Sequence, residues 1–156
     1  MSELLVDILK TIVPSLVVAI TTAFLTVRLS LRRFHAERWW ERKEAAYSSL
    51  IDVVHRLKEY ARHHYERELG GEDPTEEEKE TIENQWKKTN AEYRRLRDLA
   101  SFHVSAETVE ILQRYDEQKS LARSDDIFEW IEKDLEATTH CLEALITDAR
   151  RDLRAQ

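Results

Sequence analysis

The sequence predicts an all-α protein in which an N-terminal transmembrane helix continues into a cytosolic bundle of about four helices. The 156 residues include only two glycines and two prolines, so the punctuation that strands and hairpins need is scarce. Charged residues make up 35% of the chain, as is typical of long amphipathic helices. Apolar residues recur at intervals of three and four, which is the spacing of one helix face. We expect residues 1–31 to form the transmembrane anchor and residues 32–156 the bundle.

The first element is an uncharged, mostly apolar run, residues 11–27, between Lys10 and Arg28. As a helix it spans about 25 Å, which is enough for a hydrocarbon core of about 30 Å if the two flanking side chains reach the headgroups. A buried helix of a soluble protein and a cleavable signal peptide are the alternatives. Glu3 and Asp7 make the leading segment acidic, which argues against a signal peptide. We therefore predict an uncleaved, single-pass membrane anchor.

Basic residues flank this run mainly on its C-terminal side. By the positive-inside rule, the N-terminus lies outside and the C-terminal domain lies in the cytoplasm. Arginines near anionic headgroups, and one of two adjacent tryptophans, are expected at the membrane interface. The predicted interface residues are Arg28, Arg32, Arg33, Arg38 and Trp39.

The second tryptophan is predicted to begin the soluble core. No glycine or proline occurs between Ser15 and Leu69, so the membrane helix should run on into the bundle. The segment LGGEDP, residues 69–74, should end it. The inward face of this helix is predicted to comprise Trp40, Lys43, Tyr47, Leu50, Val54, Leu57, Ala61 and His64.

Three further helices follow from capping signals and spacing. Asp73 as a cap, Pro74 in the first turn and the glutamates after it predict a second helix that ends near Ser101. Ser105 should cap a third, shorter helix, and a fourth should begin at Ser124. The predicted inward residues are Ile82, Trp86, Thr89, Tyr93, Leu96 and Ala100 in the second helix, and Ile131, Leu135, Thr138, Leu142, Leu145, Ala149 and Leu153 in the fourth.

The apolar run carries a stripe of hydroxyl side chains. Thr11, Ser15, Thr22 and Thr26 fall within an arc of about 60° on a regular helix. We call these four residues the hydroxyl stripe. Such a stripe is able to join membrane helices side by side or to line a pore formed by several copies. The alternative is that the hydroxyls bond carbonyls of their own helix and face lipid.

Composition narrows the classes of function. The net charge of −7 makes nucleic acid an unexpected partner. The single cysteine, Cys141, excludes an internal disulfide. His63 and His64 with Glu59 crowd onto one helical stretch, without the second cluster that a metal site needs. The sequence predicts no metal and no cofactor.

One spacing does suggest chemistry. Helical nucleases of the HEPN class carry an arginine and a histidine with four to six residues between them, and Arg97 and His103 fit that pattern. The chain holds three such pairs, about as many as chance gives for its content of arginine and histidine. No catalytic residue is therefore favoured, and Arg97 with His103 stands as the alternative.

The span together with the stretch RRFHAERWWERKEAAYSSLIDVVHRLKEY, residues 32–60, resembles a loose group of small bacterial single-span proteins with helical cytosolic domains. The plan is also similar to that of membrane accessory proteins of type VI CRISPR systems, which have HEPN-like helical bodies. This resemblance implies assembly into oligomers in a bacterial inner membrane, and a role in antiphage defence.

These observations favour a non-enzymatic protein that self-associates in the membrane, where it perturbs the bilayer or organises partners. One alternative is a membrane-tethered HEPN-like ribonuclease that uses Arg97 and His103. Another is a plain anchor that recruits a cytosolic protein. The expected partners are the lipid bilayer, further copies of the chain and a cytosolic protein.

Overall fold

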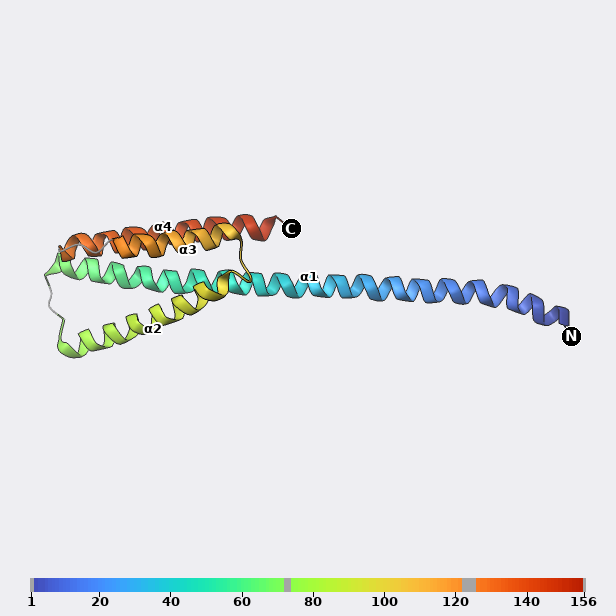
Figure 1. Ribbon diagram of the computed structural model, residues 1–156. Helices are drawn as coiled ribbons and strands as arrows, with labels where there is room; N and C mark the ends of the chain where they lie inside the picture. Colours follow the sequence, from blue (N-terminus) through green and yellow to red (C-terminus); the bar gives the residue numbers. More distant parts are fainter. Residues whose placement is uncertain (1, 72–73, 122–125, 156) are drawn as a thin grey trace. The chain divides into compact units, whose positions relative to one another are not determined.

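The computed structural model describes four α-helices and no strand in residues 2–71, 74–121 and 126–155 (Figure 1). Side chains are described for the same ranges, except for residues 2–18, 35 and 36. The helices are α1 (Ser2–Gly70), α2 (Glu76–Ala100), α3 (Ala106–Leu121) and α4 (Ile127–Arg154). The all-α class and the helical bundle are therefore confirmed.

The chain divides into two compact units, Met1–Glu41 and Arg42–Gln156. The first unit is the N-terminal part of α1, and the apolar side chains described in it are exposed, among them Ile20, Phe24 and Leu29. No helix is long and apolar enough to cross a membrane within the residues whose side chains are described. Residues 11–18 of the predicted span, residues 11–27, lie outside those residues, and the span stays a prediction.

The second unit is an antiparallel bundle of the C-terminal part of α1 with α2, α3 and α4 (Figure 1). Its core draws on all four helices, because each turns one apolar face inward. Tyr93 of α2 meets Tyr115 of α3 edge to face, with ring centroids 5.6 Å apart. The core comprises Leu50, Val53, Val54, Leu57, Tyr93, Ala100, Ile111, Leu112, Tyr115, Ala137, Cys141, Leu142 and Leu145.

The inward face of α1 begins later than the sequence predicts. Tyr47, Leu50 and Leu57 are buried as expected, but Trp40 remains 38% exposed and lies in the first unit. The prediction that Trp40 begins the core is therefore wrong. The apolar spacing continues past the point at which the bundle begins, so spacing alone did not mark this boundary.

The helix boundaries correct two capping predictions. Thr75 is the N-cap of α2 and forms a capping box with Glu78, so α2 begins two residues after Pro74. Asp126 caps α4 by accepting from the backbone of Phe128 and Glu129, in place of the predicted Ser124. Two predictions are confirmed: Ser105 caps α3, and α1 ends within LGGEDP, where Gly71 has a φ of 63°.

Candidate functional site

A group of buried and half-buried polar side chains lies at the end of the bundle that begins with residue 42, which we call the proximal end. The C-terminal ends of α1 and α3 lie at the opposite, distal end (Figure 1). Members of the group come from α1, from the start of α3 and from the last turns of α4. The proximal cluster comprises Lys43, Tyr47, Ser105, Thr108, Asp148 and Asp152.

Asp152 links α4 to α1 at this end. Its carboxylate accepts from Lys43 Nζ at 2.7 Å and from Tyr47 Oη at 2.6 Å. Tyr47 Oη also accepts from the backbone N–H of Ser105, at 3.1 Å. One phenol, 1% exposed as a residue, therefore joins α1, α4 and the turn before α3.

Asp148 links α4 to the beginning of α3. Its Oδ2 accepts from Ser105 Oγ and from Thr108 Oγ1, and its Oδ1 accepts from Arg151. Ser105 Oγ in turn accepts from the backbone N–H of Thr108 at 3.0 Å and so caps α3. The Asp148 side chain is only 3% exposed, so these donors replace the water it gives up on folding.

The hydrogen bonds in this cluster also set its electrostatics. Burial alone raises the pKa of Asp148, but the donors Ser105, Thr108 and Arg151 outweigh it and the pKa is lowered. Burial is likewise outweighed at Asp152, where Lys43 and Tyr47 lower the pKa. Both carboxylates are therefore ionised at neutral pH. The cluster holds three helices together, and its two carboxylates are engaged as hydrogen-bond acceptors.

Arg97 and His103, the alternative catalytic pair, lie on either side of the end of α2. Arg97 Nη1 binds Asp116 of α3 at 2.6 Å, and Nη2 binds Asp98 at 2.9 Å. Tyr93 Oη donates to the other oxygen of Asp116 at 3.0 Å. His103 is half-buried in the turn, and its backbone N–H donates to Ala100. The Arg97 guanidinium thus joins α2 to α3.

The five predicted interface residues are all exposed on α1: Arg28, Arg32, Arg33, Arg38 and Trp39. Arg33 forms an ion pair with Glu37 at 2.9 Å, and the Arg38 guanidinium lies 4.5 Å from the centroid of the Phe34 ring. Within the part of α1 that has described side chains, these are contacts along a single helix. The prediction that they lie at a membrane interface is not tested by them.

Two members of the hydroxyl stripe have described side chains. Thr22 and Thr26 are exposed, and Thr26 Oγ1 donates to the Thr22 carbonyl at 2.8 Å. Thr11 and Ser15 lie outside the residues whose side chains are described. The hydroxyl of Thr26 is thus satisfied within its own helix, which is the alternative that the sequence left open.

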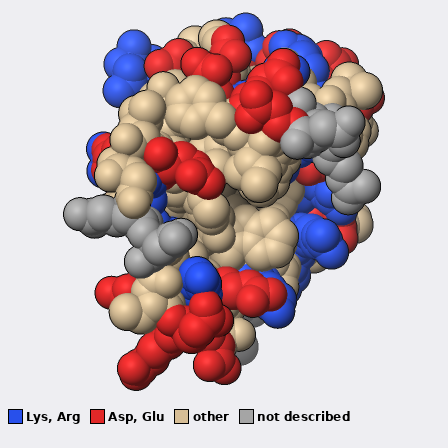
Figure 2. Space-filling model, turned by 90° about the vertical axis from the view of Figure 1, so that its left-hand side faces the viewer, with Lys and Arg blue, Asp and Glu red and all other residues tan. Residues whose placement is uncertain are grey.

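Aromatic side chains line a groove of about 750 Å³ between α1 and α2, which we call the α1–α2 groove. Tyr60 of α1 meets Trp86 of α2 at 6.2 Å between ring centroids and His64 at 5.6 Å. Burial, followed by the nearby Arg67 charge, lowers the pKa of His64. In Figure 2, which faces the distal end, acidic side chains gather around a mostly uncharged, hollowed centre. The groove is able to accept an apolar or aromatic group.

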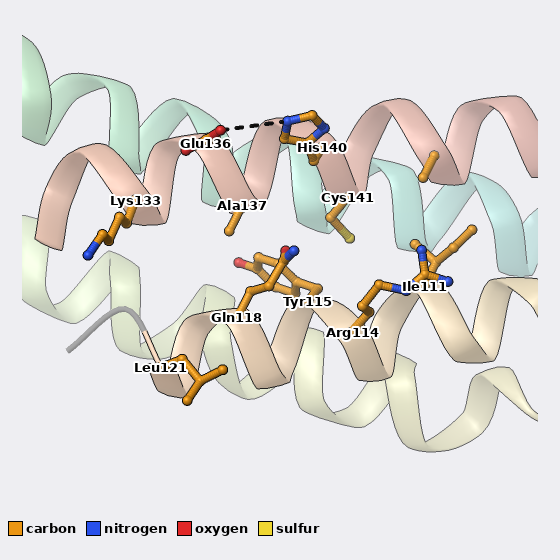
Figure 3. A pocket seen from close by; sticks show the side chains of 11 residues that line it. Ile111, Arg114, Tyr115, Gln118, Leu121, Lys133, Glu136, Ala137, His140 and Cys141 are labelled. Carbon is orange, nitrogen blue, oxygen red and sulfur yellow. Dashed lines mark ion pairs between the residues drawn. The ribbon is translucent and has the colours of Figure 1, made fainter. Parts of the chain in front are cut away.

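A second hollow, of about 590 Å³, lies between α3 and α4 (Figure 3). On its rim, His140 pairs with Glu136 at 3.9 Å, and Cys141 points inward from the same helix. Burial raises the pKa of the Cys141 thiol to about 12. Because the thiolate is the reactive form, Cys141 is a core residue and not a nucleophile at neutral pH.

No cluster of three or more histidine, cysteine, aspartate or glutamate side chains suited to a metal ion occurs among the described residues. Comparisons with protein-family models, curated proteins and solved structures find no match. The function must therefore be argued from the residues themselves.

The proximal cluster is the feature that the sequence did not reveal as a unit. Lys43 and Ser105 were assigned to a helix face and a cap, while Asp148 and Asp152 received no role. A signal does exist: the two aspartates are four residues apart and flank Ala149 on the inward side of α4. Acidic residues next to an apolar stripe indicate buried partners on another helix.

Proposed function

We propose that the chain is a non-enzymatic helical protein that is anchored in the bacterial inner membrane and self-associates there, with its bundle in the cytoplasm. It acts by perturbing the bilayer or by organising partners at it. A role in antiphage defence is the biological setting that the resemblance suggests.

The observation that carries the proposal is the continuity of α1. A single helix, Ser2–Gly70, includes the uncharged run, the arginine-rich segment and the first helix of the bundle core. The arginines and Trp39 that follow the run are exposed, as a membrane interface requires. A soluble bundle has no need of a long helix that leaves it with an exposed apolar surface.

Support for a non-enzymatic role comes from the contacts of the polar side chains in the bundle. The carboxylates of the proximal cluster are engaged in bonds between helices, and Arg97 is held by Asp116. An arginine that stabilises charge on a phosphate must instead be directed at the substrate. The ribonuclease alternative therefore rests on spacing alone.

Self-association is supported by the hydroxyl stripe, because small polar residues allow membrane helices to approach closely. The bond from Thr26 to the Thr22 carbonyl does not oppose this, since a hydroxyl oxygen is still able to accept a bond from a second helix. The stripe is therefore the part of the chain on which a test of self-association should act.

The test is the mass of the detergent-solubilised protein, with Thr22→Leu and Thr26→Leu combined in one variant. The wild type is expected to contain several copies, and the variant fewer, because both changes remove hydroxyls and preserve apolar length. Thr21→Leu is the matched control, since Thr21 lies about 100° around the helix from Thr22. A single-copy wild type overturns self-association, and equal masses for wild type and variant assign the stripe to lipid.

A second candidate function, recruitment of a cytosolic partner, is favoured by the α1–α2 groove. A photo-crosslinking amino acid at Lys88, which lines the groove, should give a specific product in cells. The same amino acid at Glu143, exposed on α4, should not. The absence of a crosslinked product at both positions would contradict recruitment through this groove.

A further inference from the structure

Three arginines surround a shallow hollow near the C-terminal end of α4. The hollow has a volume of about 490 Å³ and is lined by Thr147, Arg150, Arg151, Arg154 and Ala155. All three arginines are exposed. We call this feature the arginine hollow.

Much of the charge in the arginine hollow is not balanced locally. Residues 148–155 carry three arginines and two aspartates. Asp148 binds Ser105, Thr108 and Arg151, and Asp152 binds Lys43 and Tyr47. Both carboxylates of the segment are thus engaged in the proximal cluster, and Arg150 and Arg154 add positive charge at its edge.

This group of arginines both destabilises and stabilises the α4 helix. Arg150 and Arg154 are four residues apart, where like charges destabilise a helix by about 0.2–0.5 kcal/mol. The negative end of the α4 dipole offsets a similar amount at an exposed site. Intrahelical energetics therefore leave the arrangement close to neutral, and an external anion gives it a clear benefit.

The position of the hollow limits what that anion is. Asp152 bonds Lys43, so the hollow lies at the proximal end of the bundle, where α1 joins it. The predicted span ends near Leu31, and the eleven residues from there to Arg42 cover about 16 Å of helix. The headgroup layer itself adds about 5–8 Å beyond the hydrocarbon. At whatever angle the two units meet, the hollow is tethered within reach of the bilayer surface.

The two ends of the bundle also differ in charge. The described residues that begin α2 at the distal end, 76–83, hold six charged side chains, of which only Lys79 is basic. Acidic side chains are prominent around that end in Figure 2. A negative membrane surface attracts the proximal end and repels the distal end.

We propose that the arginine hollow binds the phosphate headgroups of anionic lipids, so that the proximal end of the bundle docks on the bilayer. This inference rests on the membrane anchor of the proposed function. It assigns to Arg150, Arg151 and Arg154 a lipid-binding role separate from that predicted for the arginines of the first unit. Docking fixes how the bundle is presented to other copies of the chain.

The test uses the full chain in lipid nanodiscs, with a fluorophore attached at Ala155→Cys and nitroxide-headgroup lipids as quencher. Cys141 is buried and its thiol is protonated, so the label goes to position 155. Wild type is expected to be quenched strongly in discs that contain phosphatidylglycerol and weakly in phosphatidylcholine alone. Added salt should reduce the difference, because exposed charges are screened.

Arg150→Gln combined with Arg154→Gln should abolish the effect of the anionic lipid. Each arginine near an anionic surface changes the binding equilibrium about fivefold, so the pair changes the docked fraction relative to the undocked by about thirtyfold. Arg62→Gln with Lys133→Gln removes the same charge from exposed positions away from the hollow and should leave quenching unchanged. Equal quenching in the two lipids, or in wild type and the Arg150/Arg154 variant, overturns the proposal.

Flotation of the same proteins with preformed vesicles separates this proposal from the anchor. Wild type and variant that both float with neutral vesicles are anchored, and quenching then decides the hollow. If wild type floats only with anionic vesicles and the Arg150/Arg154 variant does not float, the membrane anchor is contradicted and lipid binding by the arginine hollow is supported. A chain that floats with neither kind of vesicle contradicts both.

Discussion

The proximal and distal ends of the bundle are closed by different kinds of contact. At the proximal end, Lys43 and Tyr47 of α1 are held by Asp152 of α4 through short, largely buried hydrogen bonds. At the distal end, α1 and α2 meet through the rings of Tyr60 and Trp86, which are half-buried beside a groove of about 750 Å³. The contacts between α1 and α4 at the first end are directional hydrogen bonds, whereas those between α1 and α2 at the second are aromatic contacts beside an open groove.

This difference suggests a division of roles. Hydrogen-bonded charges tolerate little change in distance or angle, so the proximal cluster specifies how α1, α3 and α4 meet. Aromatic contacts next to open space allow small movements at little cost, so the distal end is able to adapt to what it binds. The end that follows the proposed anchor is thus the more tightly defined of the two.

The largest effect is expected when a buried core side chain is compared with one that lines the α1–α2 groove. Leu50→Ala removes a leucine that is 1% exposed, and should lower the free energy of unfolding by about 2–5 kcal/mol. Ile82→Ala in the wall of the α1–α2 groove should cost less than about 1.5 kcal/mol, because the isoleucine is only partly buried. Thermal unfolding followed by circular dichroism in detergent measures both. Equal losses would contradict the contrast between the ends.

A somewhat smaller loss is expected when the proximal cluster loses its most buried carboxylate. Asp148→Ala leaves the hydroxyls of Ser105 and Thr108 without their acceptor and should cost about 2–4 kcal/mol. Glu143→Ala, on the exposed side of the same helix, should stay within about 0.5 kcal/mol of wild type. The same unfolding assay compares them. A loss at Asp148 as small as that at Glu143 would show that the cluster contributes little to stability.

The cluster also predicts how stability depends on pH. Asp148 and Asp152 have lowered pKa values in the folded protein, so the unfolded chain takes up protons first as the pH falls. Their contribution is complete above the ordinary aspartate pKa of about 3.9 and is lost as the pH falls through the folded-state values. The midpoint temperature of unfolding should therefore decrease as the pH is lowered from about 5 to about 3. The decrease should be less steep in Asp148→Asn than in wild type. If the midpoint depends on pH in the same way in wild type and in Asp148→Asn, Asp148 does not contribute to the pH dependence of stability.

The smallest effect is expected at Arg97, outside the proximal cluster. Arg97→Gln breaks a partly exposed ion pair with Asp116 and should cost no more than about 1 kcal/mol. With His103→Ala added, any effect of the chain on cells, such as antiphage defence, should persist if the chain is anchored and non-enzymatic. Purified wild type should not cleave RNA. Metal-independent cleavage that either single change abolishes would establish the ribonuclease alternative.

The fold could be predicted from the sequence because its information is local. Spacings of three and four identified the inward faces of α2 and α4, and scarce glycine and proline left LGGEDP as the clear end of α1. The caps of α2 and α4 were misplaced because several residues near each start are able to cap a helix. Trp40 was misassigned because the apolar spacing along one helix does not indicate where the helices that pack against it end.

The proximal cluster could not be predicted in the same way. Lys43 and Asp152 are separated by 109 positions, and their pairing depends on how far each helix extends at that end. Tyr47 was predicted as a core residue, but nothing local to it shows that its hydroxyl accepts from Ser105. The α1–α2 groove was missed for a related reason: spacing placed Trp86 on an inward face without showing how closely α1 approaches it.

The most direct test of the account is whether the chain stays in the membrane during alkaline carbonate extraction. An anchor formed by residues 11–27 is held by the hydrophobic effect, whereas a surface-bound protein is held mainly by charge contacts that the salt of the carbonate solution screens. We expect the full chain to remain in the membrane pellet as integral proteins do. Its release into the supernatant would contradict the membrane anchor on which the proposed function rests.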